Sequence, residues 1–309
     1  MKRLTLILTI LVAAASCAQL ATDAPKRQGW NIKTPLYGDV ESVTITVYSL
    51  KDSFGVLSRS KIEGKYCYNF NQSGDVTERA EYGSAGSLKS KYTYKYDTKG
   101  NITELVLYNS DGSLCYKVIF KYDTKGNRTE EVLYNSDGSL FVKSIYKYDI
   151  KGNKTEEAGY NSDGSLKGKY IYKYDTQGNK TEEAEYNSDG SLWYKLTVKY
   201  DTQGNKTEEA EYNSDGSLKG KYTYKYDIQG NNTEAAEYTP DGSLWYKNIY
   251  KYDTQGNKTE EAKYDSDGSL VNKWIYKYDT QGNLTEITKY YGEMQKPIGQ
   301  TVYTIIYRK

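Results

Sequence analysis

The sequence predicts an all-β protein: a repetitive meander of antiparallel β-hairpins forming a single twisted or coiled sheet, an open, solenoid-like ribbon. Three observations predict this fold class. A unit of 26 residues recurs at constant spacing, each unit holds two glycine turns, and the runs between the turns alternate and are rich in Tyr, Thr and Lys. No segment has the apolar period of 3.6 residues that is typical of an amphipathic helix.

The repeat covers residues 66–290, and its clearest mark is a Gly-Asn dipeptide. Compositional bias alone does not hold a register of 26 residues through eight copies, so the units are structural. The eight turn glycines are Gly100, Gly126, Gly152, Gly178, Gly204, Gly230, Gly256 and Gly282.

Each unit contains two tight turns, represented by residues 175–179 (Asp-Thr-Gln-Gly-Asn) and 187–191 (Asn-Ser-Asp-Gly-Ser). Asp and Asn favour the first position of a type I turn, and glycine supplies a positive φ. Runs of about eight residues separate the turns, which is an ordinary strand length. One unit is therefore a pair of antiparallel strands.

Alternation along the strands predicts two chemically different faces. The tyrosines of the first strand share one side, and its lysines share the other. Counting back from the turn places Ile171 opposite Glu183 and Lys169 opposite Glu185, so the second face is expected to be a Lys–Glu lattice.

The turn spacing also predicts a displacement between units. Counting pairs across two successive turns leads from Tyr172 through Glu182 to Leu196, two residues short of the equivalent position, Val198. The shift is roughly 7 Å along the strand direction. A displacement in one sense, added to strand twist, predicts a stair-stepped ribbon with the tyrosine face on its concave side.

Outside the repeats, four further segments are expected. Residues 1–17 are a signal peptide, residues 18–35 a flexible tether, residues 36–65 an amino-terminal β cap and residues 291–309 a carboxy-terminal β cap. Within the caps, residues 43–48 are expected to cover the first sheet edge and residues 301–307 the last.

The leader has two basic residues, Lys2 and Arg3, followed by about a dozen apolar residues, too few to span a bilayer comfortably. Its end, residues 14–17 (Ala-Ala-Ser-Cys), resembles a bacterial lipobox, which implies lipidation of Cys17 and an outer-membrane or cell-surface location. The alternative is ordinary cleavage after Ala18 and a secreted or periplasmic protein.

The motif Tyr-Asp-x-x-Gly-Asn, as in residues 174–179, resembles the YD repeat of the RHS family. With its leader, the chain resembles the YD-repeat surface lipoproteins of Bacteroides-type bacteria. That resemblance implies β-strand repeats, an envelope setting, and binding of an extracellular glycan or protein. Large family members form hollow shells around a toxin. Because this chain lacks a toxin domain and has few repeats, we expect no closed shell.

Composition excludes several functions. Histidine is absent, which removes His-based catalysis and His-containing metal sites. The chain has 42 basic and 41 acidic residues, so nothing favours nucleic acid as a partner. Glu182 and Glu183 are neighbours on one strand and point to opposite faces, so they do not form a glycosidase pair. The turn at residues 187–191 lacks the ligand series of a calcium loop. We therefore expect no enzyme activity, catalytic residue, cofactor or metal.

The one irregular slot in the repeats lies just after the second turn. Trp193 and Trp245 occupy it in two units, where they interrupt the Lys–Glu face beside Glu185 and Glu237. Phe141 and Val271 hold the same slot in other units, and Lys167 and Lys219 in the remainder. Exposed aromatic rings on a polar sheet are typical of sugar or protein binding, and Trp193, Trp245 and Phe141 are the candidate ligand-binding site. The simpler alternative is packing over lysine stems. At the level of the whole chain, the alternative to a binding module is an envelope scaffold without a specific ligand.

Overall fold

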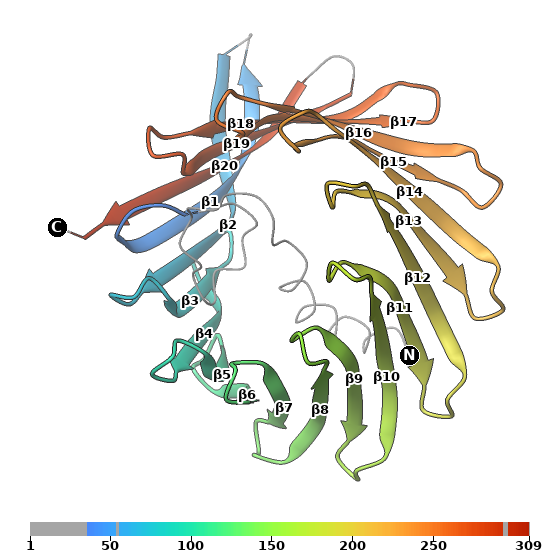
Figure 1. Ribbon diagram of the computed structural model, residues 1–309. Helices are drawn as coiled ribbons and strands as arrows, with labels where there is room; N and C mark the ends of the chain where they lie inside the picture. Colours follow the sequence, from blue (N-terminus) through green and yellow to red (C-terminus); the bar gives the residue numbers. More distant parts are fainter. Residues whose placement is uncertain (1–35, 54–55, 293–295, 309) are drawn as a thin grey trace.

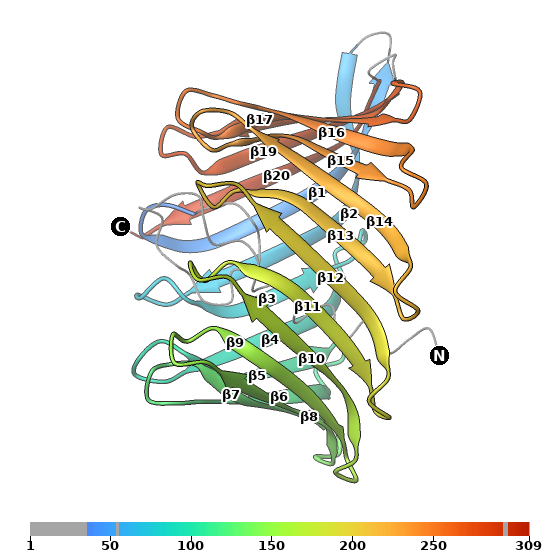
Figure 2. The same cartoon turned by 45° about the vertical axis from the view of Figure 1, so that its right-hand side comes forward.

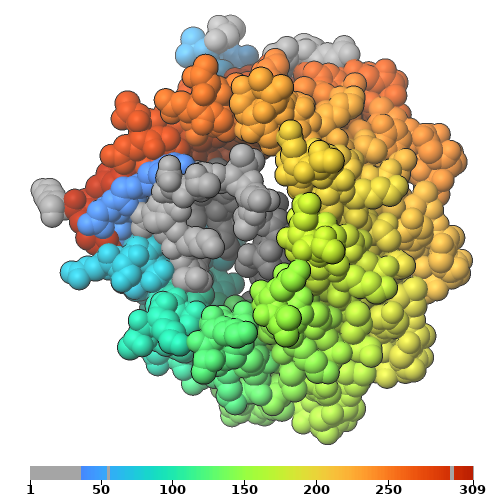
Figure 3. All heavy atoms as spheres, viewed as in Figure 1, coloured from blue at the N-terminus to red at the C-terminus, as the bar shows by residue number. Residues whose placement is uncertain are grey.

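The computed structural model describes residues 36–53, 56–292 and 296–308. Within these ranges, twenty antiparallel strands form one sheet around a central opening (Figures 1 and 3). In chain order the strands are β1 Val40–Ser53, β2 Val56–Phe70, β3 Val76–Tyr82, β4 Leu88–Tyr96, β5 Ile102–Asn109, β6 Leu114–Tyr122, β7 Arg128–Asn135, β8 Leu140–Tyr148, β9 Lys154–Asn161, β10 Leu166–Tyr174, β11 Lys180–Asn187, β12 Leu192–Tyr200, β13 Lys206–Asn213, β14 Leu218–Tyr226, β15 Asn232–Tyr238, β16 Leu244–Tyr252, β17 Lys258–Asp265, β18 Leu270–Tyr278, β19 Leu284–Tyr291 and β20 Lys296–Tyr307.

The sheet closes on itself, so the predicted open ribbon is wrong. Strand β1 pairs with β2 on one side and with β20 on the other, and β20 also pairs with β19. The segments that we expected to cover opposite edges therefore pair with each other. An even number of strands in a meander brings the last strand back antiparallel to the first, and closure removes both exposed sheet edges.

The displacement between units is confirmed, although the individual pairs differ by one residue from those expected. Tyr172 pairs with Glu183, and Glu183 pairs with Leu196, so each unit shifts by two residues. The one-residue difference comes from a β-bulge beside each turn. The bulges at the two turns of a unit offset each other, which preserves the shift.

This shift explains why twenty strands suffice for closure. Two residues for every two strands amount to a shear of about 20 residues round the barrel, which inclines the strands at about 40° to its axis. The incline is visible in Figure 2. Strands about 4.8 Å apart at that incline give a perimeter of roughly 125 Å and a backbone diameter of roughly 40 Å. A barrel of this size is too wide for side chains alone to fill.

The turns of one rim are held by an aspartate in every unit. In the representative turn, Asp175 Oδ1 accepts hydrogen bonds from the backbone N–H groups of Gln177 and Asn179, both at 2.9 Å. Gly178 has a φ of 90°, which the turn requires and which other residues rarely adopt. Hydrogen bonds from Asn179 hold the pKa of Asp175 below its usual value.

The tyrosine four residues before each turn glycine, here named the motif tyrosine, joins its unit to the preceding one. The ladder between β9 and β10 ends at the pair Glu156–Ile171, which leaves the Lys154 carbonyl beyond it. Tyr174 donates its hydroxyl to that carbonyl at 2.7 Å. The same hydrogen bond, from the hydroxyl to the backbone carbonyl 20 residues earlier, is made by the other motif tyrosines: Tyr96, Tyr122, Tyr148, Tyr200, Tyr226, Tyr252 and Tyr278.

The main apolar cluster lies where the barrel closes, on β1, β2 and β20, the segment before β1 and the start of β3. Its buried members are Leu36, Val40, Val43, Ile45, Tyr68, Phe70 and Val76, with Tyr303 and Ile305 of β20 packed against them. Asn283 is fully buried nearby and donates to the Tyr307 hydroxyl at 2.7 Å. The closing strands are therefore joined by side-chain packing in addition to backbone pairing.

The tyrosine side faces the interior. Side chains converge on the concave side of a barrel and spread on its convex side, so the concave side is the more enclosed. Tyr172 and Glu157, on the tyrosine side, are 8% and 6% exposed. The side chain of Lys173, on the other side, is 64% exposed. The bulges also move Glu183 and Glu185 to the tyrosine side, contrary to the lattice that we expected.

The outer face carries a chain of ion pairs built on one glutamate per unit. Glu182 contacts Lys173 of its own hairpin and Lys195 of the next strand, each at 2.8 Å. Hydrogen bonds from Lys173 and Lys195 hold the pKa of Glu182 below its ordinary value. Glu104, Glu130, Glu208 and Glu260 are held by two lysines in the same way and have lowered pKa values.

Closure can be tested by a disulfide across the seam. Thr46 of β1 pairs with Val302 of β20, a spacing that a disulfide bridges. In a chain that begins after residue 18 and carries Ser at Cys67 and Cys115, Thr46→Cys with Val302→Cys should crosslink nearly completely on mild oxidation. Thr46→Cys with Thr223→Cys, which is far from the seam on β14, is the control. In an open ribbon the end strands would lie up to roughly 90 Å apart, so absence of the seam crosslink would contradict closure.

Removal of one motif-tyrosine hydroxyl should weaken the barrel. Tyr174→Phe leaves the Lys154 carbonyl without its donor, so we expect the free energy of unfolding in urea to fall by about 1 kcal/mol. The control is Tyr186→Phe, since the ring of Tyr186 contacts Lys169 Nζ on the outer face and phenylalanine preserves that contact. Equal losses in the two variants would show that the hydrogen bond contributes nothing specific.

Acid should destabilise the barrel through the outer glutamates. A carboxyl whose folded pKa lies below its unfolded value stabilises above the unfolded pKa, near 4.3, and loses that contribution as the pH falls through the folded value. Burial raises the pKa of Glu131 and Glu185, which acts in the opposite sense for those two groups. More carboxyl groups have a lowered pKa than a raised one, so the Tm should fall steeply below about pH 4. Glu182→Gln should flatten this fall, and a Tm that rises in acid would refute the account.

Candidate ligand-binding site on the inner wall

The two faces of the barrel differ in how much the units vary. On the outer face, the residues nine and five before each turn glycine are Lys in all eight units, and the fourth residue after it is always Glu. The inner face varies from unit to unit. Eight residues before the glycine, for example, stand Tyr92, Val118, Ser144, Tyr170, Leu196, Tyr222, Asn248 and Trp274. Differences between units therefore concentrate on the wall of the interior.

The two candidate tryptophans lie at the rim of this wall. A bulge separates Leu244 from Tyr246, so Trp245 turns to the same side as Tyr246, with their rings 5.4 Å apart. The sequence placed the tryptophans on the Lys–Glu face beside a glutamate. In the structure each tryptophan does lie beside a glutamate, but the tryptophan and the glutamate are both on the tyrosine side. Trp193 and Trp245 are 60% and 58% exposed.

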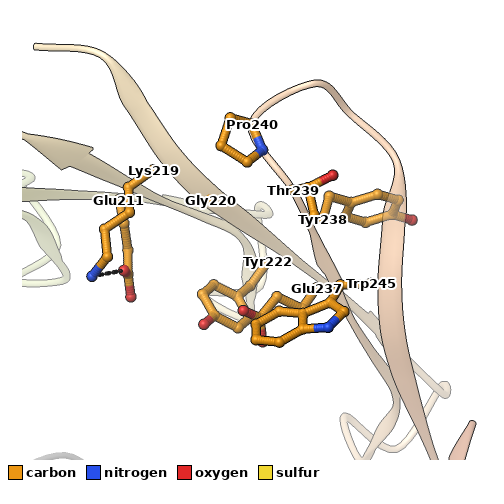
Figure 4. Close-up of a pocket in the computed structure, with 9 residues that line it drawn as sticks. All are labelled: Glu211, Lys219, Gly220, Tyr222, Glu237, Tyr238, Thr239, Pro240 and Trp245. Carbon is orange, nitrogen blue, oxygen red and sulfur yellow. Dashed lines mark ion pairs between the residues drawn. The ribbon is translucent and has the colours of Figure 1, made fainter. Parts of the chain in front are cut away.

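A hollow of about 390 Å³ lies beside Trp245. Tyr222, Glu237 and Trp245 come together in it (Figure 4). Gly220 opens the space, because the equivalent residues in the two adjacent units are Tyr194 and Tyr246. The remaining lining residues are Glu211, Lys219, Tyr238, Thr239 and Pro240.

The hollow combines a buried acceptor with a paired charge. Glu237 is only 8% exposed. Burial, followed by a hydrogen bond to Glu237, raises the pKa of Tyr246 to about 12, and the pKa of Tyr222 is raised by the same causes. Lys219 Nζ lies 3.1 Å from Glu211 Oε2 (Figure 4). The site thus presents an aromatic face beside carboxylate oxygens, and its lysine is neutralised.

The structure does not bring the three candidate aromatics together. Phe141, Trp193 and Trp245 are the second residues of β8, β12 and β16, so consecutive members lie four strands apart, which is about 19 Å measured across the sheet. Phe141 also has different neighbours: Leu133 stands where Trp245 has Glu237, and Val118 stands where it has Tyr222. Leu133 and Val118 belong to an apolar cluster with Phe120. Cys17, the predicted lipidation site, lies outside the described residues.

Reasoning from sequence found Glu237 beside Trp245 but missed Gly220, Tyr222 and Glu211, which also line the hollow. The available signal was an alternation between strands that begin Leu-Lys-Gly and strands that begin Leu-Trp-Tyr, as at residues 218–220 and 244–246. Single units, compared one at a time, do not show this alternation. Within the ranges that the structure describes, no group of three or more side chains could hold a metal ion. The same ranges contain no helix of the length and apolarity needed to cross a membrane.

Comparison with known proteins gives only distant likenesses. No protein-family model and no curated protein matches the chain. A porin-like protein from Bacteroides uniformis is 12% identical, with 86% of this chain and 98% of that chain covered and a TM-score of 0.38. A chain of the Photorhabdus luminescens Tc holotoxin pore is 11% identical, with 78% of this chain and 20% of that chain covered and a TM-score of 0.22. These scores are too low to establish a common fold, and the chain spans about a fifth of the toxin chain.

Proposed function

We propose that the barrel is a non-enzymatic envelope protein that binds a glycan at the rim of its inner wall. The observation that carries the proposal is the hollow at Trp245, where an exposed indole lies beside the buried carboxylate of Glu237. A sugar ring has an apolar face that stacks on an aromatic ring and hydroxyls that donate to carboxylates. The volume of about 390 Å³ lies within the usual range for small-molecule sites, roughly 300–1,000 Å³.

The charge balance of the hollow favours a neutral glycan. Lys219 is neutralised by Glu211, and Glu237 remains as an acceptor whose donors are tyrosine hydroxyls. An anionic sugar placed there would face two carboxylates and one already paired lysine, which is electrostatically unfavourable. A protein partner is the other class that the sequence left open. The small, concave shape of the site favours a sugar ring over a flat protein surface.

The outer wall supports a location beside a membrane rather than within one. Barrels that span a membrane present to the lipid an apolar band about 25 Å tall. Here each unit presents two lysines and a glutamate on its outer face, and Lys173 is largely exposed. Attachment through a lipid on Cys17, as the leader's resemblance to a lipobox implies, would leave such a barrel in water at the outer membrane or cell surface.

A scaffold without a ligand is the second candidate, and one observation favours it. The outer face is nearly identical in all eight units, as in a protein whose surface serves only stability or regular packing. The varied inner wall is not explained by that role. The two candidates therefore differ in whether the tryptophans at the rim matter for function.

Glycan binding can be tested with the purified chain lacking residues 1–18. We expect it to bind neutral polysaccharides on a glycan array, and Trp245→Ala to weaken binding by about tenfold or more, as for an aromatic residue at the centre of a site. Ile150→Ala is the matched control, because Ile150 is an exposed apolar residue of a turn on the other rim. An array without a neutral glycan signal, or equal affinities for the two variants, would leave the scaffold as the better account.

A further inference from the structure

The residues around Trp245 recur 52 residues earlier in the chain. This interval is two units, and it aligns residues 166–195 with residues 218–247. Lys167, Gly168, Tyr170, Glu185 and Trp193 thereby correspond to Lys219, Gly220, Tyr222, Glu237 and Trp245. The units between and beside these two sets lack the combination. The residues of the site therefore recur every second unit, whereas the turns recur in every unit.

The structure gives the earlier set the same local arrangement. Trp193 is exposed and is the extra residue of a bulge, as Trp245 is. Glu185 accepts a hydrogen bond from Tyr170, as Glu237 does from Tyr222. A Cβ at Gly168 would lie 2.8 Å from the Tyr186 carbonyl oxygen, so the close approach of the next strand requires glycine there.

Three lining residues differ between the sets. The position of Glu211 beside Lys219 is occupied by Gly159 beside Lys167, and Glu183, which acts on Glu185, stands where the later set has Ala235. Thr239 and Pro240 of the later turn are replaced by Asn187 and Ser188. The tryptophan, the glutamate and the glycine are the same residue types, but Glu185 is only half-buried where Glu237 is buried.

We propose that Trp193, Tyr170, Glu185 and Gly168 form a second glycan site, so that one chain-like glycan is held at two points on the inner wall. This inference rests on the proposed function. The two tryptophans lie four strands apart, about 19 Å across the sheet, and four residues apart along the strand direction, about 14 Å. Their separation along the wall is roughly 23 Å. Only a glycan of several sugar rings reaches both sites, and linkage of two sites raises affinity without any new contact.

The experiment compares short and long glycans. Isothermal titration would use cello-, manno- and xylo-oligosaccharides, each as a disaccharide and as a hexasaccharide, with the chain lacking residues 1–18. In the series that binds, we expect two disaccharides per barrel and a hexasaccharide affinity at least about tenfold higher. Trp193→Ala and Trp245→Ala should each lower the disaccharide stoichiometry to one and remove the advantage of the hexasaccharide.

Phe141→Ala is the matched control. Phe141 occupies the same slot after the turn but has Leu133 and Val118 in place of the glutamate and tyrosine, so its loss should change neither stoichiometry nor affinity. Far-UV circular dichroism would verify that all three variants remain folded.

The outcomes separate the two proposals. One disaccharide per barrel, abolished by Trp245→Ala and unaffected by Trp193→Ala, would overturn the second site and leave the proposed function intact. Binding that neither tryptophan variant changes would overturn both. No binding by any series would refute a neutral glycan as the ligand, and the second site with it.

Discussion

The hydrogen bond of the motif tyrosine is the interaction on which the barrel depends. Each turn of the repeats has a bulge beside it, and the backbone ladder between β9 and β10 ends at the pair Glu156–Ile171, before either strand ends. The carbonyl left beyond the last pair, that of Lys154 in the representative unit, accepts the hydroxyl of Tyr174 instead. A side-chain hydrogen bond thus takes the place of a backbone hydrogen bond between the two strands. Because the contact joins neighbouring units, it holds the two-residue shift that inclines the strands and allows closure.

Much of this fold was predictable from residues that recur. The turn at residues 175–179, its glycine, and the shift that brings Tyr172 level with Leu196 all follow from spacing and turn chemistry. The bulges were not predictable, since a bulge moves a pair by one residue without altering the alternation of the strand. That single residue carries Glu183 from the outer face to the tyrosine side. Closure was missed because it depends on shear and strand number taken together.

The candidate site was predictable only in part. Trp193 and Trp245 stand out because they interrupt a repeat. Gly220 and Tyr222 do not, since glycine and tyrosine are common in every unit, and only the fold shows that they meet a tryptophan. Phe141 illustrates the opposite error: its slot is the same, but an apolar cluster stands where the tryptophans have a carboxylate and a tyrosine. Position in a repeat identifies a slot, whereas neighbours across the sheet determine its chemistry.

The construction of each unit from two strands has a consequence for how such chains diversify. Gain or loss of one 26-residue unit through recombination between near-identical repeats keeps the strand number even, so β1 and β20 would still meet antiparallel. The shear changes by the same two residues as the strand number, so the incline of the strands is conserved. The circumference of such a barrel therefore changes only in steps of one unit, which is two strands. The interior can thus become wider or narrower in evolution while the pairing of β1 with β20 stays the same.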